Sequence, residues 1–298
     1  MSNNKLICPL GDPNSSCNWQ ITPGKIRDEN EVGMLECLTC ELKGHEVDLR
    51  HKVNYESGSM HSWTGGYGEE LVGPSLDKKR RIDFLKEILQ FDINKSILDF
   101  GCGNGEMLEV LKSEFENIMG LEPDIGAKDS AVRKGFEVVN SIIELTTRNM
   151  KFDLITLFHV IEHIYEPTDL LEEIKSLLKP GGLLVIETPN SQDALIALYE
   201  SDRFRNYTYW SHHPYLYSNK SLGMLVQSTG FEIISNSGVQ RYSIDNHMYW
   251  LSKGLPGGHE IWNTKFDEEL KNAYNKNLVD RNMHDTLWLV ARNPYDPN

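Results

Sequence analysis

Apolar and polar residues follow a regular order along the central part of the chain. Short apolar runs, each suited to one buried strand, begin at residues 98, 118, 136, 152 and 183. Between them lie helical patterns from Asn104 to Phe115, from Asp124 to Gly135, and from near Pro167 to Lys179. Strands that alternate with helices of about ten to fifteen residues predict a mostly parallel sheet with helices on both faces, a doubly wound α/β fold.

The flanks of this pattern are less regular. Residues 76–89 place apolar side chains on one helical face, which predicts a helix that packs on the sheet just before its first strand. After the fifth strand the order is interrupted twice, by insertions at 199–218 and 240–285, and a sixth strand at 231–239 lies between them. A closing apolar strand at 285–292 completes an expected sheet of seven strands.

A glycine-rich turn directly follows the first predicted strand. Gly101, Gly103 and Gly105 stand at alternate positions and a helix begins at once, so the backbone can turn sharply and a ligand can lie against it. The spacing differs from the G-x-G-x-x-G fingerprint of dinucleotide sites. Asp99 precedes the turn, and Glu122 ends the second strand, where two carboxylate oxygens match a pair of hydroxyl donors. The alternative is a turn that serves only the packing of helix on strand.

This D-x-G-x-G-x-G pattern with its second-strand acid resembles the cofactor site of class I S-adenosylmethionine (SAM) dependent methyltransferases. The stretches FDLITLFHVIEHIYEP and KPGGLLVIETPN extend the resemblance over about residues 97–190. It implies a Rossmann-like methyltransferase fold in which the glycine turn cradles the methionine part of SAM, Asp99 helps to hold its amino group, and Glu122 accepts from both ribose hydroxyls.

One position departs from that family. Many relatives carry an Asp after the third strand that accepts from the adenine amino group, whereas this chain has Asn140 and Ser141 there. The cofactor-binding residues that the resemblance implies are Asp99, Gly101, Gly103, Gly105, Glu122, Pro123, Asn140, Ser141, Ile142, Phe158 and His159.

Composition narrows the partners and the compartment. The chain of 298 residues carries 30 Lys plus Arg against 44 Asp plus Glu, a formal charge of −14, and such a field repels nucleic acid and acidic membranes. The sequence contains no apolar run of about eighteen residues and no basic-then-apolar leader, so we expect neither a membrane span nor a secretory signal. We expect a cytoplasmic enzyme with a small-molecule partner, and homodimerisation through the late insertions stays open.

Four of the five cysteines fall in the first forty residues, and the fifth, Cys102, lies in the glycine turn. Clustered thiols in a reducing compartment favour tetrahedral zinc over disulfides. Cys37 and Cys40 have a standard knuckle spacing, whereas eight residues separate Cys8 from Cys17. We expect residues 1–51 to form a cysteine-rich segment around one structural zinc, and the alternative is a metal-free hairpin subdomain.

A lid loop and the leading helix are expected over residues 52–96, ahead of a cofactor-binding core at 97–298. The loop is rich in Gly, Ser and aromatic residues, and in methyltransferases of this type such a segment often folds over SAM. A surface linker is the alternative. The candidates for closing the site are Tyr55, His61, Trp63 and Tyr67.

Histidines gather where the fourth strand ends. His159 and the pair Glu162-His163 follow that strand, and the acid–histidine pair resembles a feature of sugar and other small-molecule methyltransferases. An alcohol acceptor benefits from a general base, for which His163 and His159 are the candidates. A carboxylate, phosphate or thiolate acceptor would need no base. Outside candidates for the base are His212, His213 and His247.

Both insertions carry an excess of aromatic and histidine residues, and aromatic walls with hydrogen-bonding tips suit a sugar or a similar polar ring. We therefore expect methylation of a sugar, sugar nucleotide or surface-glycan precursor, with O- and C-methylation both open. The alternatives are an aromatic or lipid-quinone acceptor, for which the sequence shows no apolar membrane-facing insertion, and a non-catalytic SAM-binding or zinc-dependent interaction module. The expected substrate-binding residues are Tyr55, His61, Trp210, His212, His213, Tyr215, Arg241, His247 and Trp250.

Overall fold

The computed structural model describes residues 10, 18–52, 74–90 and 92–295. The chain divides into two compact units, of which unit 1 comprises residues 1–53, 159–170 and 186–290, and unit 2 comprises 54–158, 171–185 and 291–298. Several predicted site residues lie outside the described ranges, namely Cys8, Cys17, Tyr55, His61, Trp63 and Tyr67.

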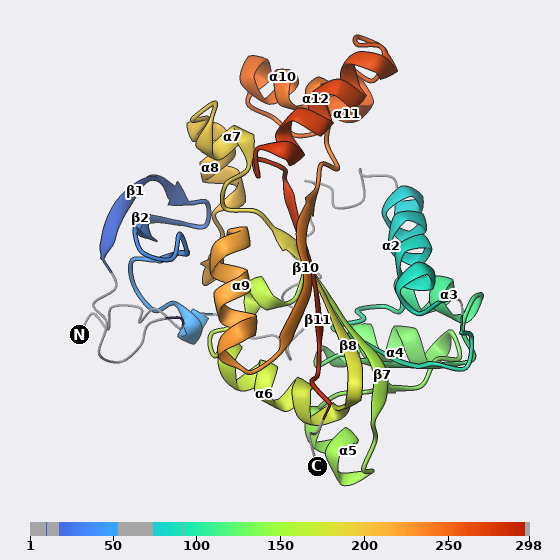
Figure 1. The fold of residues 1–298 in the computed structure, drawn as a ribbon. Coiled ribbons are helices and arrows are strands. Elements are labelled where there is room, and N and C mark those ends of the chain that lie inside the picture. Colours follow the sequence, from blue (N-terminus) through green and yellow to red (C-terminus); the bar gives the residue numbers. More distant parts are fainter. Residues whose placement is uncertain (1–9, 11–17, 53–73, 91, 296–298) are drawn as a thin grey trace. The chain divides into compact units, whose positions relative to one another are not determined.

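A seven-stranded sheet of strand order β10-β11-β8-β7-β4-β5-β6 is the framework of the fold (Figure 1). β4 pairs in parallel with both β5 and β7, and β5 pairs in parallel with β6. This confirms the predicted α/β fold with a mostly parallel sheet of seven strands. The strands are β4 (Ser96–Phe100), β5 (Asn117–Leu121), β6 (Val138–Val139), β7 (Phe152–Phe158), β8 (Leu178–Pro189), β10 (Glu232–Val239) and β11 (Thr286–Arg292).

Helices follow the strands much as the periodicity predicts. The side chain of Asp124 caps α4 by accepting from the backbone N–H of Ala127, which fixes where that helix begins. The short helix α5 after β6 was not predicted from the sequence, because its single turn and a half is too short to show a helical period. The helices of this part of the chain are α2 (Pro74–Ile88), α3 (Glu106–Lys112), α4 (Ile125–Arg133), α5 (Ile142–Thr147) and α6 (Pro167–Leu177).

The centre of unit 2 is made by β4 and β7, whose apolar side chains are buried on both faces of the sheet. Ile97 and Leu98 of β4, and Leu154 and Ile155 of β7, are fully buried. Parallel strands covered on both faces read as continuous apolar runs, which is why the sequence pattern located them well.

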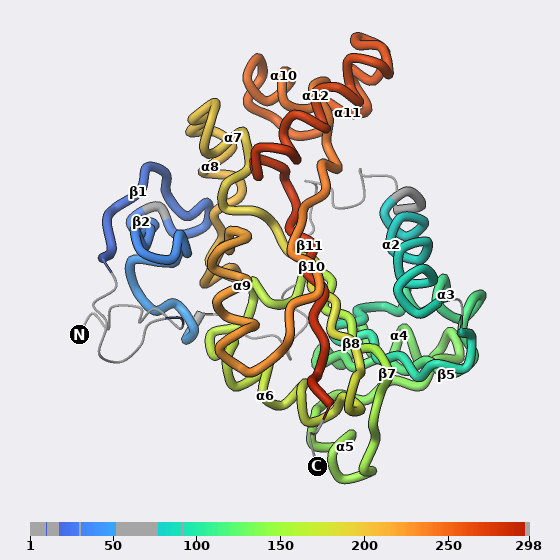
Figure 2. The backbone as a smooth tube through the Cα atoms, viewed as in Figure 1, coloured from blue at the N-terminus to red at the C-terminus, as the bar shows by residue number. Residues whose placement is uncertain are grey.

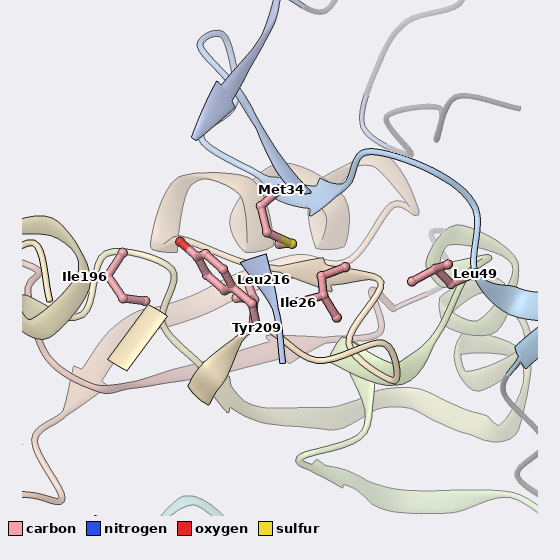
Figure 3. Close-up of a cluster of buried hydrophobic side chains, with 6 residues drawn as sticks. All are labelled: Ile26, Met34, Leu49, Ile196, Tyr209 and Leu216. Atoms are coloured by element: carbon pink, nitrogen blue, oxygen red, sulfur yellow. The ribbon is translucent and has the colours of Figure 1, made fainter. Parts of the chain in front are cut away.

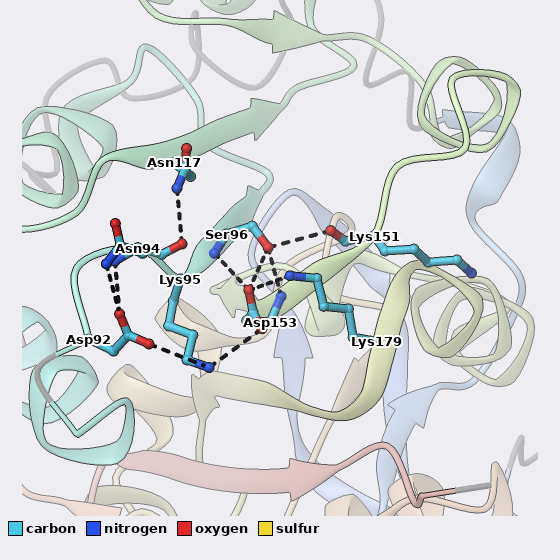
Figure 4. A network of polar contacts seen from close by, with 8 residues as sticks. All are labelled: Asp92, Asn94, Lys95, Ser96, Asn117, Lys151, Asp153 and Lys179. Atoms are coloured by element: carbon cyan, nitrogen blue, oxygen red, sulfur yellow. Dashed lines mark hydrogen bonds and ion pairs between the residues drawn. The ribbon is translucent and has the colours of Figure 1, made fainter.

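A polar network ties the starts of β4 and β7 together (Figure 4). Asp153 accepts from the backbone N–H of Ser96 at 2.9 Å, from its hydroxyl at 2.7 Å and from the Lys179 ammonium at 2.7 Å. Partial burial opposes ionisation of this carboxyl, but the donors outweigh it and lower the pKa of Asp153 to about 2. The network holds the ends of the strands that lie away from the glycine turn.

The N-terminal sheet of unit 1 has the order β1-β2-β3-β9. β1 (Trp19–Ile26), β2 (Glu29–Cys37) and β3 (Lys43–His45) form an antiparallel ribbon, and β3 pairs with β9 (Tyr215–Leu216) from the first insertion. A one-turn 3-10 helix, η1 (Arg50–Lys52), follows the ribbon. The N-terminal segment and the first insertion therefore build one sheet.

A shared apolar cluster holds that sheet to the insertion (Figure 3). Ile26 and Met34 from the ribbon pack with Tyr209 and Leu216 from the insertion, and Leu49 and Ile196 complete the buried set. The short helix α7 (Ala194–Ala197) precedes the insertion, and α8 (Asp202–Thr208) lies within it and packs on β1. The burial of these apolar side chains stabilises the packing of the ribbon against the segment from residue 194 to residue 216.

The second insertion is helical. Between β10 and β11 it forms α10 (Ile244–Lys253), α11 (Gly258–Ile261) and α12 (Glu268–Asp280), and α9 (Asn219–Ser228) precedes β10. The backbone trace shows that α10, α11 and α12 follow β10 before the chain returns along β11 (Figure 2). Within the described ranges, no helix has the length and apolarity that a bilayer crossing requires.

Candidate functional site

The glycine turn of unit 2 has the backbone that its residues predict. Gly101, Gly103 and Gly105 have φ angles of 76°, 53° and 83°, a region that favours glycine. The backbone N–H groups of Gly101 and Cys102 both donate to the carbonyl oxygen of Leu121, at 2.7 and 3.1 Å. These bonds anchor the turn to the carboxyl end of β5, and Glu122 is the residue that follows this strand.

Glu122 fastens the turn from the other side. One carboxylate oxygen accepts from the backbone N–H of Gly103 at 2.8 Å, and the other accepts from the backbone N–H of Asp124 at 2.9 Å. A carboxylate has about four acceptor positions, so two backbone bonds are compatible with accepting ribose hydroxyls as well. The contact of Glu122 with the ribose hydroxyls stays a prediction.

Asp99 lies at the end of β4, opposite Gly120 on β5 and Thr156 on β7. Its carboxylate accepts from the Thr156 hydroxyl at 2.8 Å. Burial raises the pKa of Asp99 to about 6, against the opposing effects of Thr156 and the nearby Arg81 guanidinium. A cationic ligand placed here would favour the ionised form.

The two later glycines of the turn differ in their surroundings. Among the described residues, a Cβ built on Gly103 meets no atom within 4 Å, whereas one built on Gly105 meets Ala131 at 3.0 Å. Asp124 carries a buried carboxylate oxygen with no hydrogen-bond partner among the described residues. An acidic turn with an unsatisfied acceptor suits a ligand that carries an ammonium, a sulfonium and hydroxyl donors.

The other predicted cofactor residues of unit 2 lie at neighbouring strand ends. Asn140 is exposed just after β6, and its backbone N–H donates to Glu144 at 3.2 Å. Ser141 and Ile142 begin α5, and Phe158 ends β7 with the Arg81 guanidinium 4.5 Å from its ring centre. Their contacts with the cofactor stay predictions.

In unit 1, the imidazole of His159 lies between two buried glutamates. Its Nδ1 is 3.1 Å from Glu162, which lies on the 3-10 helix η3 (Ile161–His163), and its Nε2 is 3.3 Å from Glu187 of β8. The second oxygen of Glu162 accepts from the Thr188 hydroxyl at 2.9 Å. Arg241, from the second insertion, places Nη1 3.3 Å from His159 Nε2. These five residues are called the imidazole cluster below.

The charges of the imidazole cluster set the proton state of its histidine. Burial alone would lower the pKa of His159, but hydrogen bonds to Glu162 and Glu187 outweigh it and raise the pKa to about 9. Burial disfavours the charged form of Glu162 and so raises the pKa of its carboxyl. The hydrogen bond and the charge of His159 outweigh this effect and hold the pKa of Glu162 below its ordinary range. A raised pKa favours the cationic form of the ring, and a cationic imidazole is a poor proton acceptor.

His163 has a different environment. Its Nδ1 lies 2.9 Å from the backbone carbonyl oxygen of His212, so this nitrogen carries the proton that it donates. In the neutral ring the lone pair then belongs to Nε2. The ring of His213 packs edge-on against His163 at 4.6 Å between centroids, and burial keeps the pKa of His213 well below its ordinary value. Of the two predicted base candidates, His163 has the arrangement that a base requires.

Two groups of residues are candidates for metal binding. Glu162, His163 and His213 present ligand-type atoms within 4.8 Å of one another, but both oxygens of Glu162 already accept hydrogen bonds, one from His159 and one from Thr188, so we assign no metal there. Cys37 and Cys40 are buried as thiols at the two ends of a tight turn, in which Glu41 N–H donates to the Cys37 carbonyl at 2.8 Å. The zinc predicted for this segment stays a prediction.

The predicted substrate residues of the first insertion divide into two groups. Trp210 stacks on His212 at 4.4 Å between ring centroids, and the Arg27 guanidinium lies 4.5 Å from the Trp210 ring, so this aromatic group adjoins His163. Tyr215 is instead buried in β9, where it packs against Tyr217.

The predicted substrate residues of the second insertion also divide. Arg241 belongs to the imidazole cluster. His247 is buried, with Nδ1 2.7 Å from the Tyr274 hydroxyl and Nε2 3.3 Å from the Gln240 amide. Trp250 is packed by Phe204 and Tyr207 at 5.2 and 5.0 Å between ring centroids. The contacts of His247 and Trp250 are those of residues that hold the insertion in place.

Glu187 and Asp124 were missed by the sequence analysis. Glu187 stands in the apolar run LLVIET, and a charged residue inside a buried strand is a signal that could have found it. Asp124 was used only to mark the start of a helix. Its capping function was visible in the sequence, whereas its unsatisfied second oxygen depends on the packing around it.

Comparisons with known proteins agree with this geometry. A family model described as "Methyltransferase domain" matches residues 76–236. The ubiquinone biosynthesis O-methyltransferase of Hydrogenovibrio crunogenus is 22% identical over 176 residues, which cover 56% of this chain and 72% of that protein. The protein of the same name from Salmonella newport is 30% identical over 158 residues, which cover 49% of this chain and 63% of that protein.

A solved structure supports the fold. The N-methyltransferase NodS from Bradyrhizobium japonicum, in complex with S-adenosyl-L-homocysteine, is similar with a TM-score of 0.50 at 14% identity, covering 81% of this chain and 100% of that chain. The first curated relatives are matched over between 52% and 72% of their own length.

Proposed function

Because this chain belongs to the methyltransferase-domain family and is a SAM-dependent methyltransferase, we propose that the group it methylates is a hydroxyl on a small ring-shaped molecule. Two separate observations support the proposal: unit 2 contains a SAM-type glycine turn, and unit 1 contains a histidine, His163, whose Nδ1 donates to a backbone carbonyl and leaves the lone pair of the neutral ring on Nε2. The two curated relatives described above are O-methyltransferases by name, which supports oxygen as the acceptor atom.

The chemistry needs alignment and one proton acceptor. When bound, SAM would supply a methyl group on a positively charged sulfur, and S-adenosylhomocysteine would leave as the carbon–sulfur bond breaks and the acceptor oxygen bonds to the methyl carbon. Asp99 and Glu122 bind the polar ends of the cofactor through their carboxylates. A hydroxyl acceptor must lose its proton, and His163 Nε2 takes it while Nδ1 stays hydrogen-bonded to the His212 carbonyl.

Two kinds of ring are candidates for the acceptor, an aromatic ring and a sugar ring, and different observations support each of them. The curated relatives act in ubiquinone biosynthesis by name, which supports an aromatic hydroxyl. Leu251, Leu255 and Ile261 are exposed on and between α10 and α11, so the second insertion carries apolar surface that the sequence pattern did not reveal and that suits an acceptor with an apolar tail. The stacked Trp210 and His212 support the predicted sugar acceptor instead.

Methyl transfer to defined acceptors tests the proposal. The full chain would be incubated with methyl-labelled SAM and, in parallel, with a catechol, a quinol carrying an isoprenoid tail, and a panel of sugar nucleotides. We expect label in an O-methyl product from at least one aromatic or sugar hydroxyl, identified by mass spectrometry. Label that appears only on nitrogen or carbon would refute oxygen as the acceptor atom.

A histidine variant tests the base. His163→Gln should lower kcat by about 10²–10⁴-fold, the usual effect of losing a general base, while the affinity for S-adenosylhomocysteine stays unchanged. His51→Gln, at an exposed histidine of unit 1, is the matched control and should behave as wild type. If His163→Gln keeps full turnover, the proton leaves by another route.

A structural zinc also belongs to the proposal. The buried turn of Cys37 and Cys40 supports one zinc held with Cys8 and Cys17, the two cysteines outside the described residues. Protein purified without chelators should contain about one zinc per chain, and Cys37→Ser should lose the metal. Metal-free wild-type protein with a normal unfolding transition would refute it.

The cytoplasmic location and the homodimer stay predictions. Fractionation of the source cells and light scattering of the purified chain would test them.

A further inference from the structure

Glu187 holds His159 at two points. The backbone N–H of His159 donates to the carbonyl oxygen of Glu187 at 2.8 Å, and the Glu187 carboxylate lies 3.3 Å from the imidazole Nε2. His159 has a φ of 57°, in the left-handed region that non-glycine residues seldom adopt. Such a conformation persists only where its surroundings enforce it, and it occurs preferentially at functional sites.

The hydrogen-bonding inventory fixes the number of protons on the ring. An ionised carboxylate only accepts, and both ring nitrogens of His159 face one, Nδ1 facing Glu162 and Nε2 facing Glu187. Both nitrogens must then donate, which makes the ring an imidazolium. Arg241 Nη1 also lies 3.3 Å from Nε2, and a bond from this guanidinium would require a bare nitrogen there instead.

Charge balance decides between these two arrangements. The side chains of Glu162 and Glu187 are 1% and 0% exposed, so their charges need compensation within the cluster. With a neutral ring, Arg241 would be one cation against two buried carboxylates. With an imidazolium, two cations face two anions, and the cluster is neutral as a whole. Within the part of the chain that the structure describes, the charged groups in contact with the imidazole are Glu162 from η3, Glu187 from β8 and Arg241 from the second insertion.

We propose that Glu187 is a positioning residue that, together with Glu162, holds His159 as a doubly protonated imidazolium, so that His159 serves the methyl transfer as a fixed hydrogen-bond donor and leaves proton acceptance to His163. The last step rests on the proposed function. The protonation state itself is a property of the protein without substrate or cofactor, and it extends the site by a residue on β8.

Nuclear magnetic resonance on the wild-type chain tests the protonation state. Protein labelled with ¹⁵N at histidine would be titrated without ligands, and the His159 signals would be assigned by their loss in His159→Gln. We expect both ring nitrogens to be protonated near neutral pH, with a titration midpoint at about 9. One protonated and one bare nitrogen near neutral pH would overturn the proposal, because it would show a neutral ring bonded to Arg241.

Glu187→Gln tests the positioning. The amide keeps the shape and one acceptor oxygen but removes the charge, so the His159 midpoint should fall by about 1–3 pH units. The matched control is Glu166→Gln, which removes the same charge from an exposed residue of unit 1 that pairs with Arg50. The control should leave the midpoint in place. An unchanged midpoint in Glu187→Gln, or an equal fall in both variants, would overturn the assignment of Glu187.

The pH profile of turnover links the cluster to the reaction. In the wild type the alkaline limb of kcat should extend to about pH 9, and in Glu187→Gln it should move down together with the midpoint measured by resonance. If the alkaline limb of kcat stays in place while the His159 titration midpoint moves, His159 does not act as a hydrogen-bond donor in the methyl transfer. If no hydroxyl acceptor is methylated, the proposed function fails while the resonance result stands. A neutral imidazole overturns this inference and leaves methyl transfer intact.

Discussion

Gly103 and Gly105 allow the cofactor site to be tested separately from the fold. Both have positive φ, at 53° and 83°, so an alanine is strained at either position. At Gly103 the angle is close to the left-handed minimum, and alanine costs about 1–2 kcal/mol there. Its Cβ meets nothing within 4 Å, so no steric term is added. Because a domain of this kind has about 5–15 kcal/mol of stability, Gly103→Ala should stay folded.

Gly105→Ala should behave differently because its Cβ points into the protein. It would lie 3.0 Å from the Ala131 Cβ and 3.1 Å from a ring carbon of Phe136, which is closer than ordinary contact. Backbone strain of about 1–3 kcal/mol and overpacking of a similar size add at this position. We expect Gly105→Ala to lose a large share of its unfolding free energy, measured by urea titration.

Binding of S-adenosylhomocysteine, measured by calorimetry, then separates the two variants. The Gly103→Ala methyl group occupies the space that we assign to the cofactor, and overpacking of about 1–3 kcal/mol corresponds to about 5–150-fold weaker binding. Folded Gly103→Ala with wild-type affinity would refute the placement of the cofactor on the open side of the turn. It would also withdraw the reason for assigning Asp99 and Glu122 to that ligand.

Three further predictions concern charge. Glu122→Gln places an amide NH₂ against a backbone N–H, either that of Gly103 or that of Asp124. We expect it to weaken S-adenosylhomocysteine binding by about 5–150-fold, the equivalent of about 1–3 kcal/mol. Calorimetry checks this, with Glu106→Gln as the exposed control. Since folding raises the pKa of His159 to about 9, its contribution to stability is complete below its ordinary value of about 6.5 and is lost as pH rises through about 9; urea titrations of wild type and His159→Gln should converge there. Since folding lowers the pKa of Asp153 to about 2, its contribution is present above its ordinary value of 3.8 and is lost as pH falls toward about 2; an acid stability curve unchanged in Asp153→Asn would contradict this.

Local sequence patterns located the central strands and the glycine turn of unit 2 well. β4 and β7 are buried on both faces and appear in the sequence as continuous apolar runs, and the alternate glycines between β4 and α3 have a spacing that few other turns share. Glu122 was found because it ends a strand next to that turn. In each case neighbours in sequence, or adjacent parallel strands, fix the geometry.

The environments of the candidate histidines of unit 1 depend on contacts between segments that are distant in the sequence. The sequence offered His159 and His163 as equivalent bases, and only the placement of Glu187 from β8 and of the His212 carbonyl from the first insertion distinguishes a cation from a proton acceptor. The contacts of His247 with Tyr274 and Gln240 likewise join segments that are separate in the sequence.

The sequence by itself therefore determined the order of strands and helices, the glycine turn and the family of the chain, because periodicity and short motifs depend on residues a few positions apart. The tertiary structure decided the pairing of β3 with β9 and the proton state of His159. These features arise from residues tens to hundreds of positions apart, whose burial and charge are set only when the chain has folded.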